Sequence, residues 1–291
     1  MAGSASPNQF IGPFYLLLCR LRAVNSAQGK VALITGAASG IGKATAALLA
    51  AEGAVICAVD FDPVGLDAIS AEALSALTIT ADCGDPAQVE AAFARCETEL
   101  GGPDIAFLNA GIAIGLSDLT QLDDATYQKI QRINVDGVVY GVRAAIDRMK
   151  RRGGGSIIAT SSLAGLIPFP ADPIYDAGKH FVVGLMRSLA PTLTRDNITC
   201  NTVNPGITDT NIIGEQTKDF LIDAGFPIIP ASQIAEAVLG LITAGVTGQC
   251  WVCQAGREPV SYEFRDVPGP RVANTAPVRP PVPLRDGWAL G

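Results

Sequence analysis

Histidine, charged residues and aromatic residues are all scarce in this sequence. Of its 291 residues, 17% are charged and 6% are aromatic, and His180 is the only histidine. A Ser-His-Asp hydrolase needs a histidine as its general base, so any such triad here would have to use His180. The sequence shows no cluster of residues that could bind a metal ion, and we predict no metal site.

Basic residues are outnumbered by acidic ones. Lys and Arg total 21 against 28 Asp and Glu, which gives a formal net charge of -7 at pH 7. We therefore expect no binding to the phosphates of a nucleic acid. The one basic run, Lys150 to Arg152, stands directly before Gly153, which is typical of the last turn of a solvated helix.

A membrane-spanning hydrophobic run is also missing. The apolar segment Phe10 to Leu21 is shorter than the ~20 residues that cross a bilayer, and no basic region precedes it. We therefore predict neither a signal peptide nor contact with a membrane. Three interpretations of residues 1–28 stay open: a flexible arm, a contact between subunits, or a misassigned start codon.

The seven cysteines are an odd number, spread over segments with strand and helix patterns. This distribution favours a reducing compartment over a disulfide framework, and we expect a cytoplasmic protein. Cys250 and Cys253 have the C-x-x-C spacing of some metal and redox sites. They lie in a segment with a strand pattern, where residues three apart point to opposite faces, which disfavours both kinds of site.

From Lys30 onward, short apolar segments alternate with longer amphipathic ones. The segments with strand patterns are 31–35, 54–60, 77–81, 105–109, 156–161, 198–203 and 249–254. The segments with helix patterns are about 41–52, 63–74, 86–100, 123–150, 174–195 and 232–243. This order predicts a single-domain α/β fold of the Rossmann type. We expect a doubly wound sheet of about seven parallel strands, flanked by helices on both faces.

The predicted domain covers residues 29–266, between two arms. Residues 1–28 form the N-terminal arm. Six prolines between Pro268 and Pro283 exclude a central strand or a helix interior, so residues 267–291 are predicted to be an extended, proline-rich C-terminal arm. In an open sheet of this kind, ligands bind at the carboxyl ends of the strands, where we expect the chemistry.

A glycine-rich turn follows the first predicted strand. In Thr35-Gly36-Ala37-Ala38-Ser39-Gly40-Ile41-Gly42, Gly36 allows a tight turn, Gly40 allows the backbone to approach a pyrophosphate, and Gly42 allows close packing of helix on strand. The N-terminus of the next helix offers free N–H groups and the positive end of a dipole to phosphates. The turn therefore predicts a dinucleotide site.

Asp60 decides which dinucleotide is expected. It ends the second predicted strand, 18 residues after Gly42, where a carboxylate accepts hydrogen bonds from ribose hydroxyls and repels a 2′-phosphate. Phe61-Asp62-Pro63 adds a second acid and no cation, so NAD is favoured over NADP. Lys43 is the nearest counter-argument, and NADP stays open as the alternative.

Together these residues resemble the short-chain dehydrogenase/reductase family. The matching motifs are, in the family's order, Thr35, Gly36, Gly40 and Gly42; Asn109-Ala110-Gly111; Asn134; Ser162; Tyr175 and Lys179; and Asn204-Pro205-Gly206. The match runs from about Lys30 to Gly256. Ser161 to Pro168 and Lys179-His180 are closest in pattern to the prostaglandin dehydrogenase-like branch, which oxidises lipid alcohols.

The resemblance implies a set of residues that contact the cofactor. They are Gly36, Ser39, Gly40, Ile41, Gly42, Asp60, Phe61, Asp82, Cys83, Asn109, Ala110, Gly111, Tyr175, Lys179, Pro205, Gly206, Ile207, Thr208 and Thr210. Within it, Asp82 would contact the adenine, Asn109 the ribose region, and Thr208 or Thr210 the carboxamide. Each of these four also fits a simpler interpretation as a turn or cap residue.

Tyr175 and Lys179 stand four residues apart in a predicted helix and therefore share a face. A tyrosine pKa is ordinarily about 10, and we expect a nearby ammonium and a cationic nicotinamide to lower it, making Tyr175 a general base. Ser162, 13 residues earlier at the end of a predicted strand, would hydrogen-bond the reacting oxygen. By the resemblance, Asn134 would support a water relay to Lys179.

Two residues depart from the family's usual form. Gly178 stands where Ser is usual before the lysine, and Asp176 follows Tyr175. Asp176 is expected to point away from the catalytic face, with a small effect on Tyr175. His180 is expected to point about 100° away from that face.

These residues predict an NAD-dependent oxidoreductase that transfers hydride between the nicotinamide and an alcohol or ketone. Apolar segments at 163–173 and 220–230 favour an apolar secondary alcohol, with a steroid, a sugar-derived alcohol and a small alcohol all open. The alternative from another class is a catalytically idle, NAD-binding sensor or interaction protein. The resemblance also implies a homodimer or homotetramer through helices at 123–150 and 174–195.

Overall fold

Eight strands form one sheet in the part of the chain that the computed structural model describes, residues 27–72, 74 and 77–265. The strands are β1 (Val31–Thr35), β2 (Val55–Asp60), β3 (Leu77–Thr80), β4 (Ile105–Leu108), β5 (Gly155–Thr160), β6 (Ile198–Pro205), β7 (Cys250–Cys253) and β8 (Val260–Ser261). Their order is β3-β2-β1-β4-β5-β6-β7-β8. The first seven are parallel, as the sequence predicts, and β8 adds an antiparallel edge.

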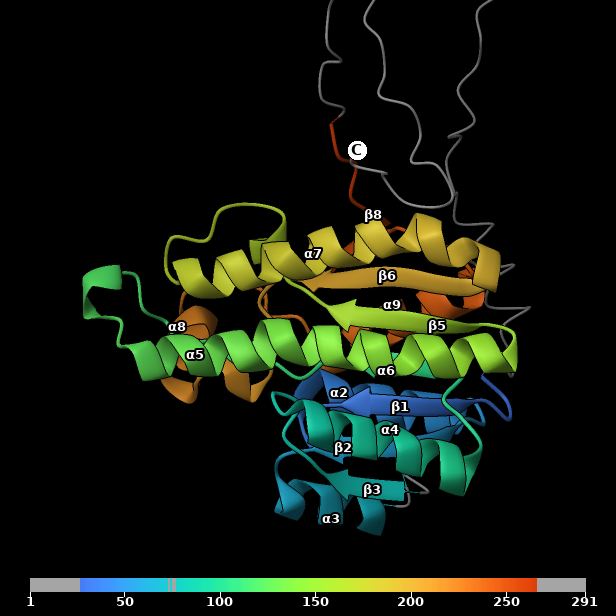
Figure 1. Cartoon of the computed structure of the whole chain (residues 1–291). Helices are drawn as coiled ribbons and strands as arrows, with labels where there is room; N and C mark the ends of the chain where they lie inside the picture. The colour runs from blue at the N-terminus through green and yellow to red at the C-terminus, as the bar shows by residue number, and fades with distance from the viewer. Residues whose placement is uncertain (1–26, 73, 75–76, 266–291) are drawn as a thin grey trace, which may run out of the picture.

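The strand order reverses between β1 and β4, because the chain first builds outward to β3 and then crosses back. Such a switch point leaves a crevice at the carboxyl ends of the strands. In Figure 1 the labelled parallel strands β1, β2, β3, β5 and β6 point toward the same side, where the short helix α8 also lies. This edge positions the site described below.

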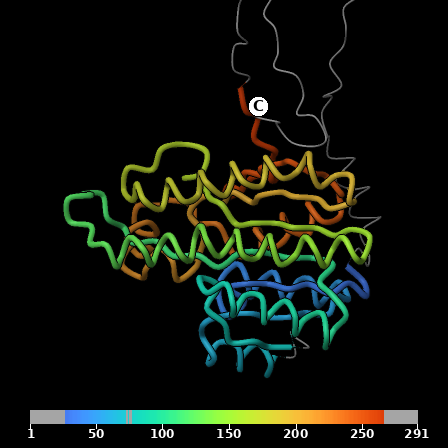
Figure 2. The backbone as a smooth tube through the Cα atoms, viewed as in Figure 1, coloured from blue at the N-terminus to red at the C-terminus, as the bar shows by residue number. Residues whose placement is uncertain are grey.

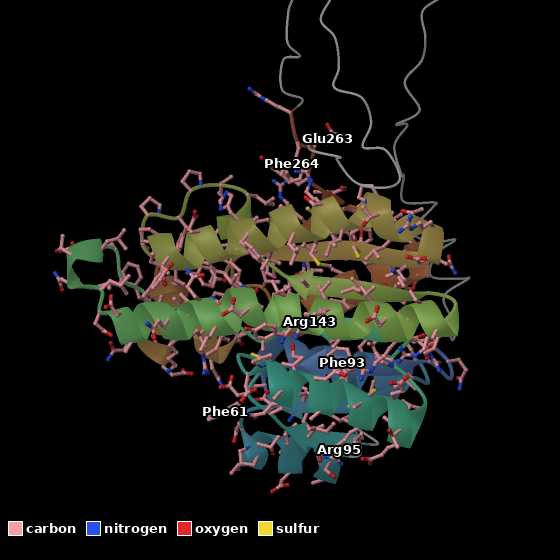
Figure 3. All side chains as sticks on the ribbon, viewed as in Figure 1. Phe61, Phe93, Arg95, Arg143, Glu263 and Phe264 are labelled. Atoms are coloured by element: carbon pink, nitrogen blue, oxygen red, sulfur yellow. The ribbon has the colours of Figure 1, made fainter. Side chains whose placement is uncertain are left out.

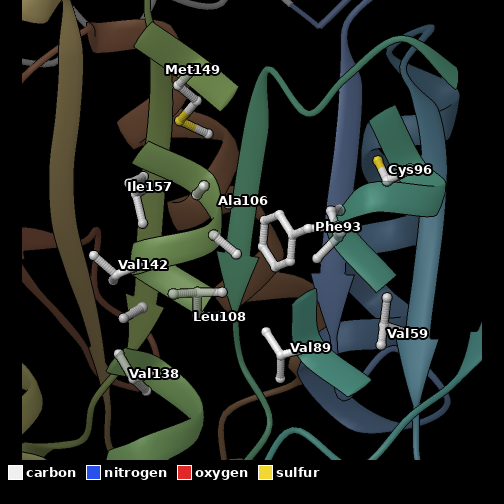
Figure 4. Close-up of a cluster of buried hydrophobic side chains, with 14 of the residues drawn as sticks. Val59, Val89, Phe93, Cys96, Ala106, Leu108, Val138, Val142, Met149 and Ile157 are labelled. Atoms are coloured by element: carbon white, nitrogen blue, oxygen red, sulfur yellow. The ribbon is translucent and has the colours of Figure 1, made fainter. Parts of the chain in front are cut away.

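Helices cover both faces of the sheet (Figures 1 and 2). One face carries α2 (Gly40–Ala51), α3 (Pro63–Ala71) and α9 (Ala231–Ala244), and the other carries α4 (Pro86–Leu100), α6 (Gly137–Arg152) and α7 (Pro173–Leu193). Each face encloses its own hydrophobic cluster. In Figure 4, Phe93 of α4 lies beside Ala106 and Leu108 of β4, all three almost fully buried. Burying a side chain as large as that of Phe93 or Leu108 stabilises the folded state by about 1.5–3 kcal/mol.

Aspartate followed by proline begins three of these helices. Asp62, Asp85 and Asp172 are the N-caps of α3, α4 and α7, and in each case proline is the next residue. The carboxylate accepts hydrogen bonds from N–H groups of the first turn, and proline needs no partner at that position. The start of each helix is therefore encoded locally.

The predicted helix at 123–150 is divided in the structure. It consists of α5 (Asp124–Gln131), a π-helical turn η2 (Arg132–Asp136) and α6. The structure also contains α8 (Glu215–Asp223) and four 3-10 turns that periodicity did not predict: η1 (Leu119–Gln121), η3 (Leu163–Gly165), η4 (Thr194–Asp196) and η5 (Asn211–Ile213). These turns are too short to show a hydrophobic period.

The proline-rich arm at 267–291, and the N-terminal arm except its last two residues, lie outside the described residues. Ala27, the first described residue, is fully buried in the cluster beneath α2 and α9. At the other end, Phe264 packs on α7, with the Arg187 guanidinium 3.5 Å from its ring centroid (Figure 3). Among the described residues, no helix is both long and apolar enough to span a bilayer.

Candidate active site

The glycine turn connects β1 to α2 at the carboxyl edge. Gly36 has a φ of 67°, and a Cβ on Gly42 would overlap the carbonyl oxygen of Gly36. A Cβ on Gly40 would lie 2.9 Å from Cγ2 of Thr210, which comes from the loop after β6. Ser39, the N-cap of α2, makes no side-chain cap bond, so its hydroxyl occupies none of the first N–H groups of the helix. The turn therefore fits the pyrophosphate of a dinucleotide.

Asp60 holds this turn against the end of β2. Its carboxylate accepts hydrogen bonds from the N–H of Ala38 at 2.9 Å and of Asp62 at 3.0 Å. Lys43, the nearest cation in sequence, donates to Glu72 at 2.7 Å. Its charge is thus balanced by an acid. Phe61, 74% exposed, follows β2 at the same edge (Figure 3).

Asp82 follows β3, where the sequence places a contact to adenine. Its Oδ1 accepts from the N–H of Gly84 at 2.8 Å, and its Oδ2 pairs with Arg132 of η2 at 2.5 Å. Asp82 therefore has the hydrogen bond of a turn residue together with an ion pair, and its predicted contact with adenine stays a prediction. Burial raises the pKa of the neighbouring Cys83 thiol to about 11.

Asn109 joins the ends of three strands. Its N–H donates to Oγ1 of Thr35 at 3.0 Å, and its side-chain amide donates to the carbonyl of Gly36 at 3.3 Å. Its Oδ1 accepts from the hydroxyl of Thr160 at 3.0 Å. Ala110 also donates to Thr35, at 3.2 Å. The floor of the crevice is thereby fixed between β1, β4 and β5.

Ser162, Tyr175 and Lys179 come together as predicted from their spacing. Ser162 follows β5, and its hydroxyl hydrogen-bonds the Tyr175 side chain. Lys179, 3% exposed, lies with Nζ 5.5 Å from the centroid of the Tyr175 ring and donates to the carbonyl of Thr160 at 2.9 Å. Burial lowers the pKa of Lys179 to about 8. Gly111 approaches the same Nζ, since a Cβ there would lie 3.3 Å from it.

The chain's own residues raise the pKa of Tyr175, whereas the sequence prediction of a lowered pKa counted both the ammonium of Lys179 and a bound cationic nicotinamide. Burial is the largest cause, and the negative charge of Asp172 adds to it. The hydrogen bond with Ser162 acts in the opposite direction. Desolvation disfavours a phenolate more than sequence spacing can indicate.

Asn134 lies in the π-helical turn and is 1% exposed. Its side chain accepts from the N–H of Ile112 and donates to the carbonyl of the same residue, both at 2.8 Å. The amide thus pins the loop that follows Asn109-Ala110-Gly111. Its predicted part in a water relay stays a prediction.

Asp172 is the residue that sequence analysis missed at this site. It is 1% exposed and accepts hydrogen bonds from the N–H groups of Ile114, Gly115 and Tyr175. The Asp-Pro pair before the catalytic helix was the signal available in the sequence. That signal predicts a helix cap, but it does not predict the hydrogen bonds from Ile114 and Gly115.

The predicted residues after β6 form the remaining wall. The carbonyl of Pro205 accepts from the Ser162 hydroxyl at 3.4 Å. Thr208 donates to the carbonyl of Gly206 at 3.0 Å, and Thr210 to that of Thr208 at 3.4 Å. Ile207 accepts from the N–H of Ile229 at 2.9 Å. The hydroxyls of Thr208 and Thr210 therefore have local hydrogen-bond partners, as turn residues do. Thr210 also lies next to Gly40 of the glycine turn.

Comparison with models of protein families identifies the family of this chain. Residues 30–220 match the family described as short chain dehydrogenase. This chain belongs to the short chain dehydrogenase family.

Two relatives and one solved structure illustrate the family. The chain is 36% identical over 195 residues to a levodione reductase of Leifsonia aquatica, covering 65% of this chain and 73% of that protein. It is 35% identical over 202 residues to the human 15-hydroxyprostaglandin dehydrogenase [NAD(+)], covering 66% and 73%. A 3-ketoacyl-(acyl-carrier-protein) reductase from Brucella melitensis, complexed with NADH, superposes with a TM-score of 0.73 at 29% identity, covering 79% of this chain and 99% of that one.

The structure shows the surroundings of the two departures from the usual family pattern, and it does not explain the glycine at position 178. A Cβ on Gly178 would meet Val135 at 3.6 Å and Asn134 at 3.8 Å, which are ordinary contacts, so the short chain dehydrogenase fold does not require glycine here. Asp176 accepts from the N–H of Phe169 at 2.7 Å and lies 3.3 Å from Nδ1 of His180. The side chains of Asp176 and His180 therefore contact each other.

Exposed apolar side chains, called the rim below, occur in the segment after η3 and in and after η5 and α8. They are Ile167, Phe169, Ile212, Phe220, Ile222 and Phe226. A pocket of about 370 Å³ lies between α8 and the loop after β6, where Lys218 of α8 donates to Asp209 at 2.6 Å. This short chain dehydrogenase thus has a mostly apolar rim with one ion pair.

The C-x-x-C pair is structural in the described part of the chain. Cys250 and Cys253 are both free and buried at the two ends of β7. Burial raises the pKa of Cys253 to about 12, which makes it unreactive. The described residues hold no group of three side chains suited to a metal ion.

Proposed function

We propose that this protein is an NAD-dependent dehydrogenase or ketoreductase that interconverts an apolar secondary alcohol and its ketone. The observation that carries the proposal is that Tyr175, Ser162 and Lys179 lie together, at the same edge of the sheet as the glycine turn. The three groups supply a proton, a hydrogen bond and a charge next to a dinucleotide cradle.

The preference for NAD is supported by charge. Asp60 places a carboxylate at the end of β2, and Lys43 is engaged by Glu72 rather than free to bind a phosphate. A 2′-phosphate would be repelled by Asp60. The NADH in the Brucella melitensis reductase and the NAD(+) in the name of the human relative belong to those proteins, and they agree with this preference.

The bound cofactor would supply the hydride acceptor in oxidation, as NAD, and the hydride donor in reduction, as NADH, and the chain's own residues would handle the proton. In oxidation Tyr175 takes the proton of the substrate hydroxyl, and in reduction it gives that proton back. Ser162 donates a hydrogen bond to the same oxygen and stabilises its developing charge. Lys179, held by Thr160, adds a positive charge close to the ring.

An apolar substrate is supported by the side chains of the rim. Phe169 and Phe220 are exposed at 44% and 71%, and they offer apolar surface that a ligand could contact. Several relatives carry cyclic alcohols or ketones in their names, among them a cyclohexanol dehydrogenase of Acinetobacter and a 3beta-hydroxysteroid dehydrogenase of Eggerthella lenta. We propose a substrate of this class, without choosing its size.

A homodimer or homotetramer through α5, α6 and α7 goes with this proposal. Tyr127 of α5 and Phe181 of α7 are 43% and 41% exposed on these helices. We propose residues 29–266 as the catalytic domain of each subunit.

The test is turnover by the purified full chain with NAD or NADP and a panel of cyclohexanol, a hydroxysteroid and a hydroxy fatty acid. Reduced cofactor should form with NAD, and should not form with Tyr175→Phe. Tyr127→Phe, the same change on an exposed helix, should keep full activity. Tight NAD binding without turnover on the whole panel would favour the sensor alternative, and a preference for NADP would overturn the interpretation of Asp60.

A further inference from the structure

Asp172 is a buried carboxylate between α7, the catalytic helix that carries Tyr175, and the loop at 112–115. Its Oδ1 accepts from the N–H of Tyr175 at 3.1 Å, and its Oδ2 accepts from the N–H groups of Ile114 and Gly115, both at 2.8 Å. Three N–H donors thus converge on one side chain that is 1% exposed. A buried charge is tolerated only when it is satisfied in this way.

The other aspartate caps in the described part of the chain lack this second set of partners. Asp85 accepts from Ala87 and Gln88 in its own first turn, and Asp123 accepts from Thr126. In contrast, Ile114 and Gly115 are 58 and 57 residues away from Asp172 along the chain. Capping alone therefore does not explain where Asp172 places its second oxygen.

The loop that Asp172 holds is also pinned at its other end. Asn134 makes two hydrogen bonds to Ile112, so Ile112 and Gly115 are anchored to η2 and α7 respectively. Gly115 adopts a φ of 64°, a conformation that glycine reaches without strain. The segment between these anchors runs beside the first turn of α7, where Tyr175 lies.

We propose that Asp172 is a positioning residue for the reaction, which fixes the loop at 112–115 to the catalytic helix and so sets the width of the substrate site beside Tyr175. This inference rests on the proposed function, since it assigns one wall of the same site. The charge of Asp172 acts at short range on the Tyr175 phenol, whose pKa it raises, which supports its place next to the reacting group. Because the bonds are charge-assisted and shielded from water, they hold the loop more firmly than a neutral cap would.

Asp172→Ser separates capping from clamping. Serine is a good N-cap and keeps an acceptor for the N–H of Tyr175, but its shorter side chain has no second oxygen for the loop. We expect kcat/KM for cyclohexanol, or whichever panel alcohol is turned over, to fall about 100-fold through misplacement of the substrate, mainly by a higher KM. The affinity for NADH should change less than about twofold, because Asp172 contacts none of the glycine turn. Asp123→Ser, the same change at an exposed cap, should leave both constants unchanged.

Hydrogen exchange tests the clamp without any turnover. In Asp172→Ser the amides of Ile114 and Gly115 should exchange at least about tenfold faster, while the amide of Tyr175 stays protected. If the unmodified protein turns over no alcohol, the proposed function fails while this measurement still decides the clamp. If Asp172→Ser does not fold, Asp172→Asn replaces one oxygen by an NH₂ group, and one of the two sets of amides must then lose protection. Unchanged exchange at all three amides, or unchanged KM with faster exchange, overturns the proposal.

Discussion

Lys179 donates a hydrogen bond from its Nζ to the carbonyl oxygen of Thr160, at 2.9 Å and out of contact with water. One neutral carbonyl does not replace the hydration of an ammonium, and the pKa of Lys179 falls to about 8 as a result. In the absence of a dinucleotide, the protein therefore maintains this cation at a cost in stability. That cost can be measured.

Lys179→Met should make the protein more stable near pH 7 while abolishing turnover. The folded-state pKa of Lys179 is about 8, below the unfolded value, so the unfolded chain binds more protons between about pH 8 and 10.5. The free energy of unfolding of the unmodified protein should therefore rise with pH through that window, by on the order of 1–3 kcal/mol. Lys179→Met should lack this rise, and urea unfolding at several pH values checks both. If the free energy of unfolding depended on pH equally in the two proteins, the lowered pKa would not belong to Lys179.

The two reaction directions should respond differently to pH. Because burial and Asp172 raise the pKa of Tyr175, its phenol is protonated near neutral pH. Ketone reduction, which needs the phenol as an acid, should be nearly constant from about pH 6 to 8, whereas kcat/KM for alcohol oxidation should rise with pH over the same range. Initial rates in both directions across this range provide the measurement. Oxidation that is independent of pH would show that Tyr175 is not the base.

Asp60→Asn should weaken discrimination against NADP. The substitution removes the charge that repels a 2′-phosphate and keeps an oxygen that can accept from Ala38. We expect the ratio of kcat/KM for NAD to that for NADP to fall about tenfold, as the loss of roughly 1.4 kcal/mol of repulsion implies. Lys43→Ala is the control, because Lys43 is paired with Glu72 and should not affect the ratio. A tenfold effect of Lys43→Ala in place of Asp60→Asn would reverse the two roles.

Gly178→Ser should leave activity intact and stabilise α7. The added Cβ would make only ordinary contacts with Val135 and Asn134, and glycine inside a helix costs about 0.5–1 kcal/mol relative to alanine, of which serine recovers a part. Thermal unfolding and turnover measure the two effects. Gly141→Ser is the contrasting variant, since its Cβ would come within 2.5 Å of Leu108 and should destabilise the protein. A loss of turnover in Gly178→Ser would mean that the family's usual serine is excluded here.

Much of the fold could be predicted because its determinants are local. The apolar runs of β1 and β2, the Asp-Pro starts of α3 and α4, and the spacing of Tyr175 and Lys179 each act over a few residues. The helix at 123–150 was predicted as one piece, because a π-helical turn at Arg132–Asp136 leaves the hydrophobic period almost unchanged.

By itself, the sequence determined the order of strands and helices, the glycine turn and the one face that Tyr175 and Lys179 share, because hydrophobic period and steric freedom are encoded within a turn or two of the chain. Only the tertiary structure decided the direction of the Tyr175 pKa shift and the second set of partners of Asp172. Both depend on burial and on segments nearly 60 residues apart, as Ile114 and Asp172 are. Desolvation and long-range hydrogen bonds arise only when the chain has folded, so a local sequence pattern does not predict them.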